Sequence, residues 1–143
     1  LASSAASDVY KRQVYEPSEE LLLAKMDSRL IVQVLINLVE NAIKYTQEGS
    51  RIEISAVQKG DMIQISVADN GKGIKEDAKE KIFDMFYTAE NKPADSRRGL
   101  GLGLFLAKSI IHAHGGTIWV TDNVPSGTIF SFTLQAEEVT ISE

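Results

Sequence analysis

The chain has 143 residues, a formal net charge of −5 and 43% hydrophobic residues, which is typical of one domain with its own core. The acidic net charge argues against nucleic acid as a partner, because proteins that bind nucleic acid usually carry a basic surface patch. The chain has no cysteine, so disulfides and thiolate chemistry are excluded. It has no run of about 18 apolar residues and no signal peptide, and we expect no direct membrane contact from this domain.

The first part of the chain predicts one long helix. Residues 1–20 are polar and weakly patterned, with a short helix expected over residues 5–12. The apolar run at residues 21–24 predicts a strand. Asp27 is typical of an N-cap, and apolar residues then recur at helical spacing to about Gln47.

A hairpin, a loop and a second helix should follow. Alternating apolar residues predict strands, and polar or glycine-rich segments predict loops. The expected elements are strands at 51–56 and 63–67, a helix at 75–81, a polar loop at 88–98, a helix from 99–103 to Gly115, and strands at 117–121 and 128–134. Residues 21–135 contain no linker, so we expect one α/β domain with a linker remnant at 1–20 and a frayed tail at 136–143.

The first long helix carries a polar stripe. Asn37, Asn41 and Lys44 are spaced i, i+4 and i+7 and share one face. Amide oxygens suit Mg²⁺, and an ammonium group suits phosphate. An ordinary solvated helix face is an equally good interpretation of this stripe alone.

Two glycine-containing loops are further candidates. Asp69 has the parity of the core-facing strand residues, and Gly71 and Gly73 would let a ligand approach the backbone. Taken alone, this loop is better explained as an ordinary turn. The second loop alternates glycine with leucine just before a helix, an arrangement that exposes amide groups to an anion. It comprises Gly99, Leu100, Gly101, Leu102, Gly103 and Leu104, preceded by Arg97 and Arg98.

Together, the ordered motifs resemble the histidine-kinase branch of the superfamily that also holds DNA gyrase, heat-shock-type chaperone ATPases and mismatch-repair ATPases. The matching segments are 33–46 (N box), 69–73 (G1 box), 82–87 (F box), 99–104 (G2 box) and 126–130 (last glycine box). The resemblance implies a two-layer α/β sandwich, with a mixed sheet covered on one face by helices. It also implies ATP and Mg²⁺ as cofactors.

The resemblance assigns roles to the matching positions. Asp69 would accept a hydrogen bond from the adenine amino group, with Thr128 supporting it, and Tyr45 would pack on the adenine plane. Asn41 would be the Mg²⁺ ligand, with Asn37 beside it and Lys44 on phosphate. The remaining nucleotide contacts expected are Gly71, Gly73, Ile74, Arg97, Arg98, Gly101, Leu102, Gly103 and Leu104, with residues 88–98 as the ATP lid.

One position separates the branches of this superfamily. Its hydrolytic members have a glutamate where this chain has Asn37, and asparagine cannot act as a general base. The resemblance therefore implies very slow hydrolysis and phosphoryl transfer to a histidine on a separate helical acceptor domain, then to a response regulator. His112 and His114 lack the acidic residue that follows acceptor histidines, so we expect structural or surface roles for them.

The resemblance also bears on the parent protein. Segments 34–46 and 114–118 are similar to KdpD-type sensor kinases of potassium and osmotic stress. A homodimeric parent anchored in the bacterial inner membrane, with this domain in the cytoplasm, is implied. An ATPase of the same superfamily, an anti-sigma-type serine kinase and a nucleotide sensor without transferase activity are the alternatives.

Overall fold

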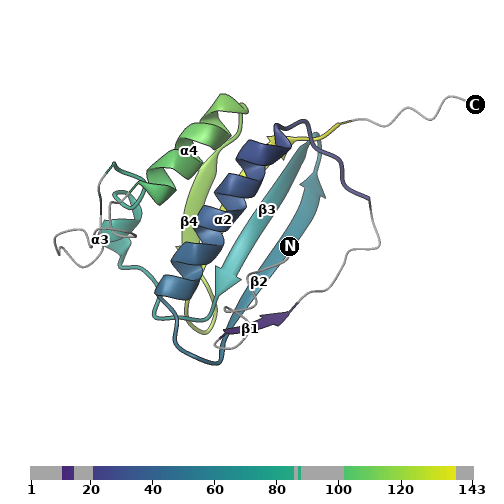
Figure 1. Cartoon of the computed structure of the whole chain (residues 1–143). Coiled ribbons are helices and arrows are strands. Elements are labelled where there is room, and N and C mark those ends of the chain that lie inside the picture. Colours follow the sequence, from purple (N-terminus) through teal and green to yellow (C-terminus); the bar gives the residue numbers. More distant parts are fainter. Residues whose placement is uncertain (1–10, 15–20, 86, 88–101, 138–143) are drawn as a thin grey trace, which may run out of the picture.

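Five strands form one mixed sheet that helices cover on one face (Figure 1). The computed structural model describes residues 11–14, 21–85, 87 and 102–137. The strand order is β1-β2-β3-β5-β4, with β1 parallel to β2 and the other pairs antiparallel. The strands are β1 (Lys11–Val14), β2 (Ser50–Lys59), β3 (Met62–Asp69), β4 (Ile118–Asp122) and β5 (Thr128–Gln135). The helices are α2 (Ser28–Lys44), α3 (Glu76–Lys79) and α4 (Gly103–Ala113). The predicted two-layer α/β fold is confirmed.

Helix α2 begins as the sequence predicts, at the N-cap Asp27. The Asp27 carboxylate accepts from the backbone N–H groups of Arg29 (3.1 Å) and Leu30 (3.4 Å). The helix ends at Lys44, earlier than expected, because the Thr46 hydroxyl binds the Ala42 carbonyl at 2.8 Å. That carbonyl would otherwise accept the next helical N–H group.

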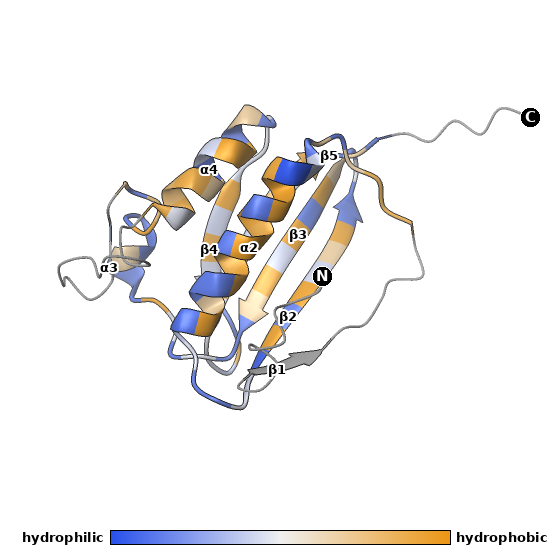
Figure 2. Ribbon diagram, in the orientation of Figure 1, coloured by the Kyte–Doolittle hydropathy of each residue, from blue (hydrophilic) through white to orange (hydrophobic). Residues whose placement is uncertain are grey.

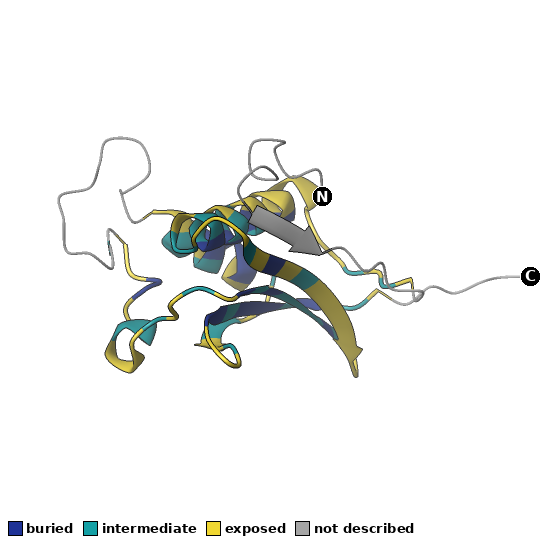
Figure 3. Ribbon diagram, turned by 90° about the horizontal axis from the view of Figure 1, so that it is seen from below, coloured by how far each residue is buried: buried dark blue, intermediate teal, exposed yellow. Residues whose placement is uncertain are grey.

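The core lies between the helices and one face of the sheet. Hydrophobic and hydrophilic residues alternate along the ribbons of α2 and α4 (Figure 2). The buried residues of both helices belong to the core between the helices and the sheet (Figure 3). The ring of Phe83 meets that of Phe130 edge-on, with centroids 6.0 Å apart. The fully buried large side chains are Phe130, Phe132, Leu38, Ile111, Leu134, Val34 and Val67.

Both ends of the chain differ from expectation. In the predicted strand at 21–24, only Ala24 pairs, through an isolated bridge to Ala136, because a short apolar run also suits a partly buried extended segment. The expected helix at 5–12 is wrong at its C-terminal end, since residues 11–12 belong to β1. There the backbone pairs with β2, and residues this far apart in the chain give no local sequence pattern that would predict the pairing. Residues 5–10 lie outside the described residues.

The beginning of the expected tail is bound to the domain. The backbone N–H of Ala136 donates to the Asp61 carbonyl and that of Glu137 to the Leu23 carbonyl, both at 2.8 Å. These bonds fix the chain beyond the predicted boundary at residue 135. The rest of the expected tail, from residue 138, lies outside the described part of the chain.

Helix α3 is shorter than predicted and is held by one lysine. The side chain of Lys79 is 13% exposed and bridges Glu76 at 2.6 Å and Asp122, at the end of β4, at 2.8 Å. The Asp122 and Glu76 side chains, as hydrogen-bond partners, raise the pKa of Lys79. This small network connects α3 to the sheet.

Candidate functional site

The polar stripe of α2 lies beside the start of α4. The Asn37 side-chain amide donates from Nδ2 to the Gly103 carbonyl at 3.1 Å. Its Oδ1 accepts from Nε2 of Gln33, also at 3.1 Å. The structure thus brings Asn37 and Gly103, two predicted nucleotide residues, into direct contact.

The next two turns of the stripe lead toward the end of α2. Asn41 is half-buried, and its side chain makes no hydrogen bond within the described part of the chain. Lys44 is exposed, with Nζ 5.3 Å from the centroid of the Tyr45 ring. The predicted metal ligand, phosphate cation and adenine-stacking ring therefore follow one another along this edge of the helix.

Asp69 closes β3 with a buried carboxylate, as its parity predicts. The residue is 5% exposed, and Oδ1 accepts from the Gly71 backbone N–H at 2.9 Å. A Cβ atom at Gly71 would lie 2.9 Å from both the Tyr45 carbonyl oxygen and Cγ2 of Thr46. Glycine is required here because the loop packs directly on the end of α2, which places Asp69 near Tyr45.

The backbone of Asp69 is held from the β4–β5 turn. Nδ2 of Asn123 donates to the Asp69 carbonyl at 2.8 Å. Thr128 is 5% exposed and is the direct cross-strand neighbour of Asp69 in the β3–β5 register. Asn123 has no distinctive signal in the sequence, because an asparagine before Pro125 and Gly127 is ordinary turn chemistry.

The glycine-rich segment enters a helix, as predicted. Gly103 is the first residue of α4, and the N-cap Leu102 supplies no side-chain hydrogen bond. The side chains of Leu104 and Ile74 are partly buried and pack against the core. Gly73 has a φ of 82° and lies against the Gly127 carbonyl. Arg97, Arg98, Gly101 and the predicted lid at 88–98 lie outside the described residues.

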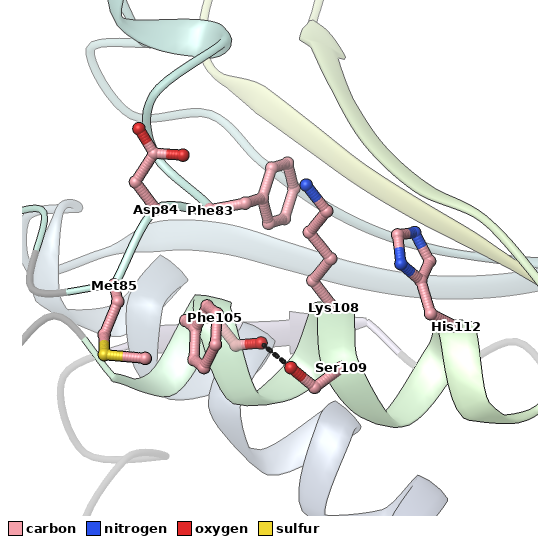
Figure 4. Close-up of a pocket in the computed structure, with 7 residues that line it drawn as sticks. All are labelled: Phe83, Asp84, Met85, Phe105, Lys108, Ser109 and His112. Atoms are coloured by element: carbon pink, nitrogen blue, oxygen red, sulfur yellow. Dashed lines mark hydrogen bonds between the residues drawn. The ribbon is translucent and has the colours of Figure 1, made fainter.

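A separate pocket of about 370 Å³ lies on the outer face of α4 (Figure 4). It is lined by Phe83, Asp84, Met85, Phe105, Lys108, Ser109 and His112. None of the predicted nucleotide residues lines it. Among the described residues predicted to bind nucleotide, Asn37 and Gly103 instead lie where α4 faces α2, and Asp69 lies at the end of β3.

His114 has the structural role predicted for it. Its Nε2 accepts from the Asp27 backbone N–H at 3.0 Å, which leaves Nδ1 to donate to the Ile110 carbonyl at 2.8 Å. The ring therefore ties the end of α4 to the start of α2. His112 is exposed and lines the outer pocket.

The sequence and fold place the chain in a known family. Residues 26–138 match the family described as "Histidine kinase-, DNA gyrase B-, and HSP90-like ATPase", and the chain belongs to this family. Its relatives within the family include the sensor histidine kinase WalK of Bacillus subtilis, and the solved catalytic domain of histidine kinase ThkA has the same α/β fold as this chain.

Three similar proteins illustrate this. The sensor protein KdpD of Clostridium acetobutylicum is 44% identical over 119 residues, which is 83% of this chain and 13% of that protein. The solved catalytic domain of histidine kinase ThkA is 39% identical with a TM-score of 0.67, covering 78% of this chain and 71% of that one. Full-length ShkA in complex with AMPPNP is 26% identical with a TM-score of 0.76, covering 95% of this chain and 27% of that one.

ThkA has also been solved in complex with the response regulator protein TrrA. That ThkA chain is 34% identical with a TM-score of 0.68, and the match covers 89% of this chain and 33% of the ThkA chain. This chain therefore spans a minor part of KdpD, of ShkA and of ThkA in that complex. Within the described ranges, no helix combines the length and apolar character needed to cross a membrane.

Proposed function

We propose that this domain binds ATP with Mg²⁺ and transfers the γ-phosphoryl group to a histidine on a separate helical domain of the same protein. A response-regulator aspartate then receives the phosphoryl group. The proposal rests chiefly on one observation: the buried carboxylate of Asp69 lies beside the C-terminal end of the amide-bearing helix α2. The TrrA complex of ThkA and the AMPPNP complex of ShkA agree with it.

The base would bind at the end of β3. A carboxylate can accept a hydrogen bond from the adenine amino group, whereas guanine presents a carbonyl oxygen at the same position. Asn123 and Gly71 hold the Asp69 backbone and carboxylate in place, and Thr128 lies beside them. Tyr45 would cover the base from the end of α2.

The phosphates would lie along α2 toward α4. Residues Asn37 and Tyr45 are separated by about 12 Å along the axis of α2, at 1.5 Å per residue. The backbone N–H groups that begin α4 would face the phosphates, since no side chain of the described residues caps this helix. Gly101, Gly103, Lys44 and Arg97 or Arg98 are proposed as the phosphate contacts.

The donor set fits Mg²⁺. An amide oxygen is a hard ligand, and Mg²⁺ is commonly held by one or two protein oxygens and substrate phosphates. Among the described residues, no cluster of three His, Cys, Asp or Glu could hold a metal. Asn41 is the proposed protein ligand. When bound, Mg²⁺ neutralises charge that develops on the transferred phosphoryl group.

In this proposal the domain positions ATP, and Asn37 does not activate water. Both the oxygen and the nitrogen of the Asn37 side chain are hydrogen-bonded, and an amide is no general base. Transfer would therefore depend on bringing the acceptor histidine to the γ-phosphate. We propose that Gly73, Ile74, Leu102 and Leu104 shape the walls through their backbone, and that residues 88–98 form the lid.

The proposal extends to the parent protein. Residues 21–135 would be the main part of the catalytic domain. Residues 1–20 would be a linker remnant from which β1 joins the sheet, and 136–143 a tail whose first two residues are bound to the domain. We propose a homodimeric parent, anchored in the bacterial inner membrane, with this domain in the cytoplasm. We propose potassium or osmotic sensing as its specific task, on the resemblance of segments 34–46 and 114–118 to KdpD-type sensor kinases.

The test is to mix the chain with a separately expressed acceptor-helix domain and ATP labelled at the γ-phosphate. Label on the acceptor that is lost in acid and retained in base identifies phosphohistidine. Acid-stable label would favour the serine-kinase alternative, and rapid phosphate release without an acceptor would favour an ATPase. ATP binding without any phosphoryl transfer would favour the nucleotide-sensor alternative.

A further inference from the structure

Two hydrogen bonds in series connect Gln33 to the first residue of α4. Gln33 lies one turn before Asn37 on α2, and its Nε2 donates to Oδ1 of Asn37 at 3.1 Å. Nδ2 of Asn37 then donates to the Gly103 carbonyl at 3.1 Å. A Cβ atom at Gly103 would lie 3.9 Å from Cγ of Asn37, so the Asn37 side chain lies directly beside the start of α4.

The chemistry of these groups fixes the direction of the series. A side-chain amide donates through its NH₂ group and accepts through its oxygen, whereas a backbone carbonyl only accepts. If the Asn37 amide turned over, its oxygen would face the Gly103 carbonyl and its NH₂ would face the NH₂ of Gln33. The Gly103 carbonyl therefore directs the Asn37 nitrogen to α4, and the Gln33 NH₂ group adds a second bond that holds the Asn37 oxygen on the other side.

We propose that Gln33 is a positioning residue for the phosphate end of the nucleotide site, acting through Asn37 on the start of α4. The inference rests on the proposed ATP binding and deepens it. Asn37 joins the two helices that would meet the phosphates, α2 through Asn41 and α4 through its first N–H groups. In this arrangement the Asn37 oxygen is engaged by Gln33, and Asn41, one turn further, is left as the metal ligand.

The test compares the phosphate-dependent part of binding in two variants. Gln33→Met keeps the length of the side chain and removes the donor without adding charge. Gln33→Glu keeps the shape but can only accept. Gln135→Glu is the control for added charge, because Gln135 is exposed and lies at the opposite end of the β3–β5 register from Asp69.

The measured quantity is the ratio of the affinity for AMPPNP with Mg²⁺ to the affinity for AMP, by calorimetry on the whole chain. We expect Gln33→Met to reduce this ratio about threefold to tenfold, the effect of one hydrogen bond, with AMP binding unchanged. Gln33→Glu should reduce it further, and Gln135→Glu should not change it. An unchanged ratio in Gln33→Met overturns the positioning role, even if Gln33→Glu binds poorly, because charge alone would then explain the loss.

Two further readouts separate positioning from general stability. In the nucleotide-free chain, Gln33→Met should shift the side-chain NH₂ signals of Asn37 in ¹H–¹⁵N spectra. In an Asn37→Ala background, Gln33→Met should have no further effect on the ratio. If the effects of Gln33→Met and Asn37→Ala on the ratio are additive, the two side chains act independently, and the proposed action of Gln33 through Asn37 is overturned. Failure of the unaltered chain to bind AMPPNP overturns the proposed function itself, whereas binding with an unaltered ratio in Gln33→Met overturns only the role of Gln33.

Discussion

Gly127 has no room for a side chain, because a Cβ atom there would lie 1.9 Å from the backbone carbonyl oxygen of Asp69. Its φ of 111° is also one that other residues rarely adopt. The same carbonyl accepts from Asn123, so the β4–β5 turn is built directly on the residue proposed to recognise adenine. The shape of this turn and the position of Asp69 are therefore coupled.

The first prediction follows from this coupling. Gly127→Ala should destabilise the domain by about 2–5 kcal/mol, because it adds a backbone clash to the unfavourable φ. Urea unfolding measures the loss. Gly49→Ala is the matched control, since Gly49 has a φ of 80° with nothing within 4 Å of a Cβ atom, and it should cost only about 1–2 kcal/mol. Equal losses in the two variants would contradict the clash.

Asp69→Asn tests recognition of the base. The substitution keeps the shape and can retain the bond from the Gly71 N–H group, so stability should change little. An ATP analogue should bind more weakly by about 1.5–3 kcal/mol, the value of a hydrogen bond to a charged group, and the preference for adenine over guanine should disappear. Competition between the adenine and guanine nucleotides measures this. Retained preference would place base recognition elsewhere in the domain.

Asn41→Ala tests the metal site. Loss of the amide oxygen should abolish the part of ATP affinity that depends on Mg²⁺, and affinity in the presence of a chelator should stay the same. Glu40→Ala, at the exposed neighbouring position on α2, is the control and should retain the dependence on Mg²⁺. If Asn41→Ala and the unaltered chain respond equally to Mg²⁺, Asn41 is not the ligand.

His114 should matter for stability and not for phosphoryl transfer. His114→Ala removes the acceptor for the Asp27 N–H and the donor to the Ile110 carbonyl, at a cost of about 1–2 kcal/mol in the free energy of unfolding. His112→Ala, at an exposed position, should cost much less. The check is urea unfolding of both variants, together with transfer to the acceptor domain. Loss of transfer in a folded His114→Ala variant would argue for a chemical role.

Lys79 should stabilise the domain up to alkaline pH. Its pKa in the folded state is raised above the ordinary 10.5 by the hydrogen bonds to Asp122 and Glu76. The contribution of this pKa shift of Lys79 to the free energy of unfolding is therefore fully present below pH 10.5. It is lost as the pH rises through the higher folded-state pKa. Lys79→Met should unfold more readily than the unaltered chain at neutral pH, and the difference should shrink at strongly alkaline pH. A difference that grows with pH would contradict the assignment.

Much of the fold and of the candidate site could be predicted because the signals are local. The helical spacing of Ile31, Val34 and Leu38 predicts the buried face of α2, and Asp27 predicts its start. Alternation along β3 predicts that Asp69 points inward, which its burial confirms. These features depend on the geometry of a single helix or strand, and the residues within that element are sufficient to specify them.

The sequence by itself determined the family, the long helix and the inward carboxylate, because periodicity and motif spacing are properties of neighbouring residues. Only the tertiary structure decided which distant groups meet. The contact of Asn37 with Gly103, the bond from Asn123 to Asp69 and the tie between His114 and Asp27 join residues 54–87 positions apart. The parallel pairing of β1 with β2 belongs with them. Such contacts arise when helices and strands pack against a shared core, and no local pattern encodes them.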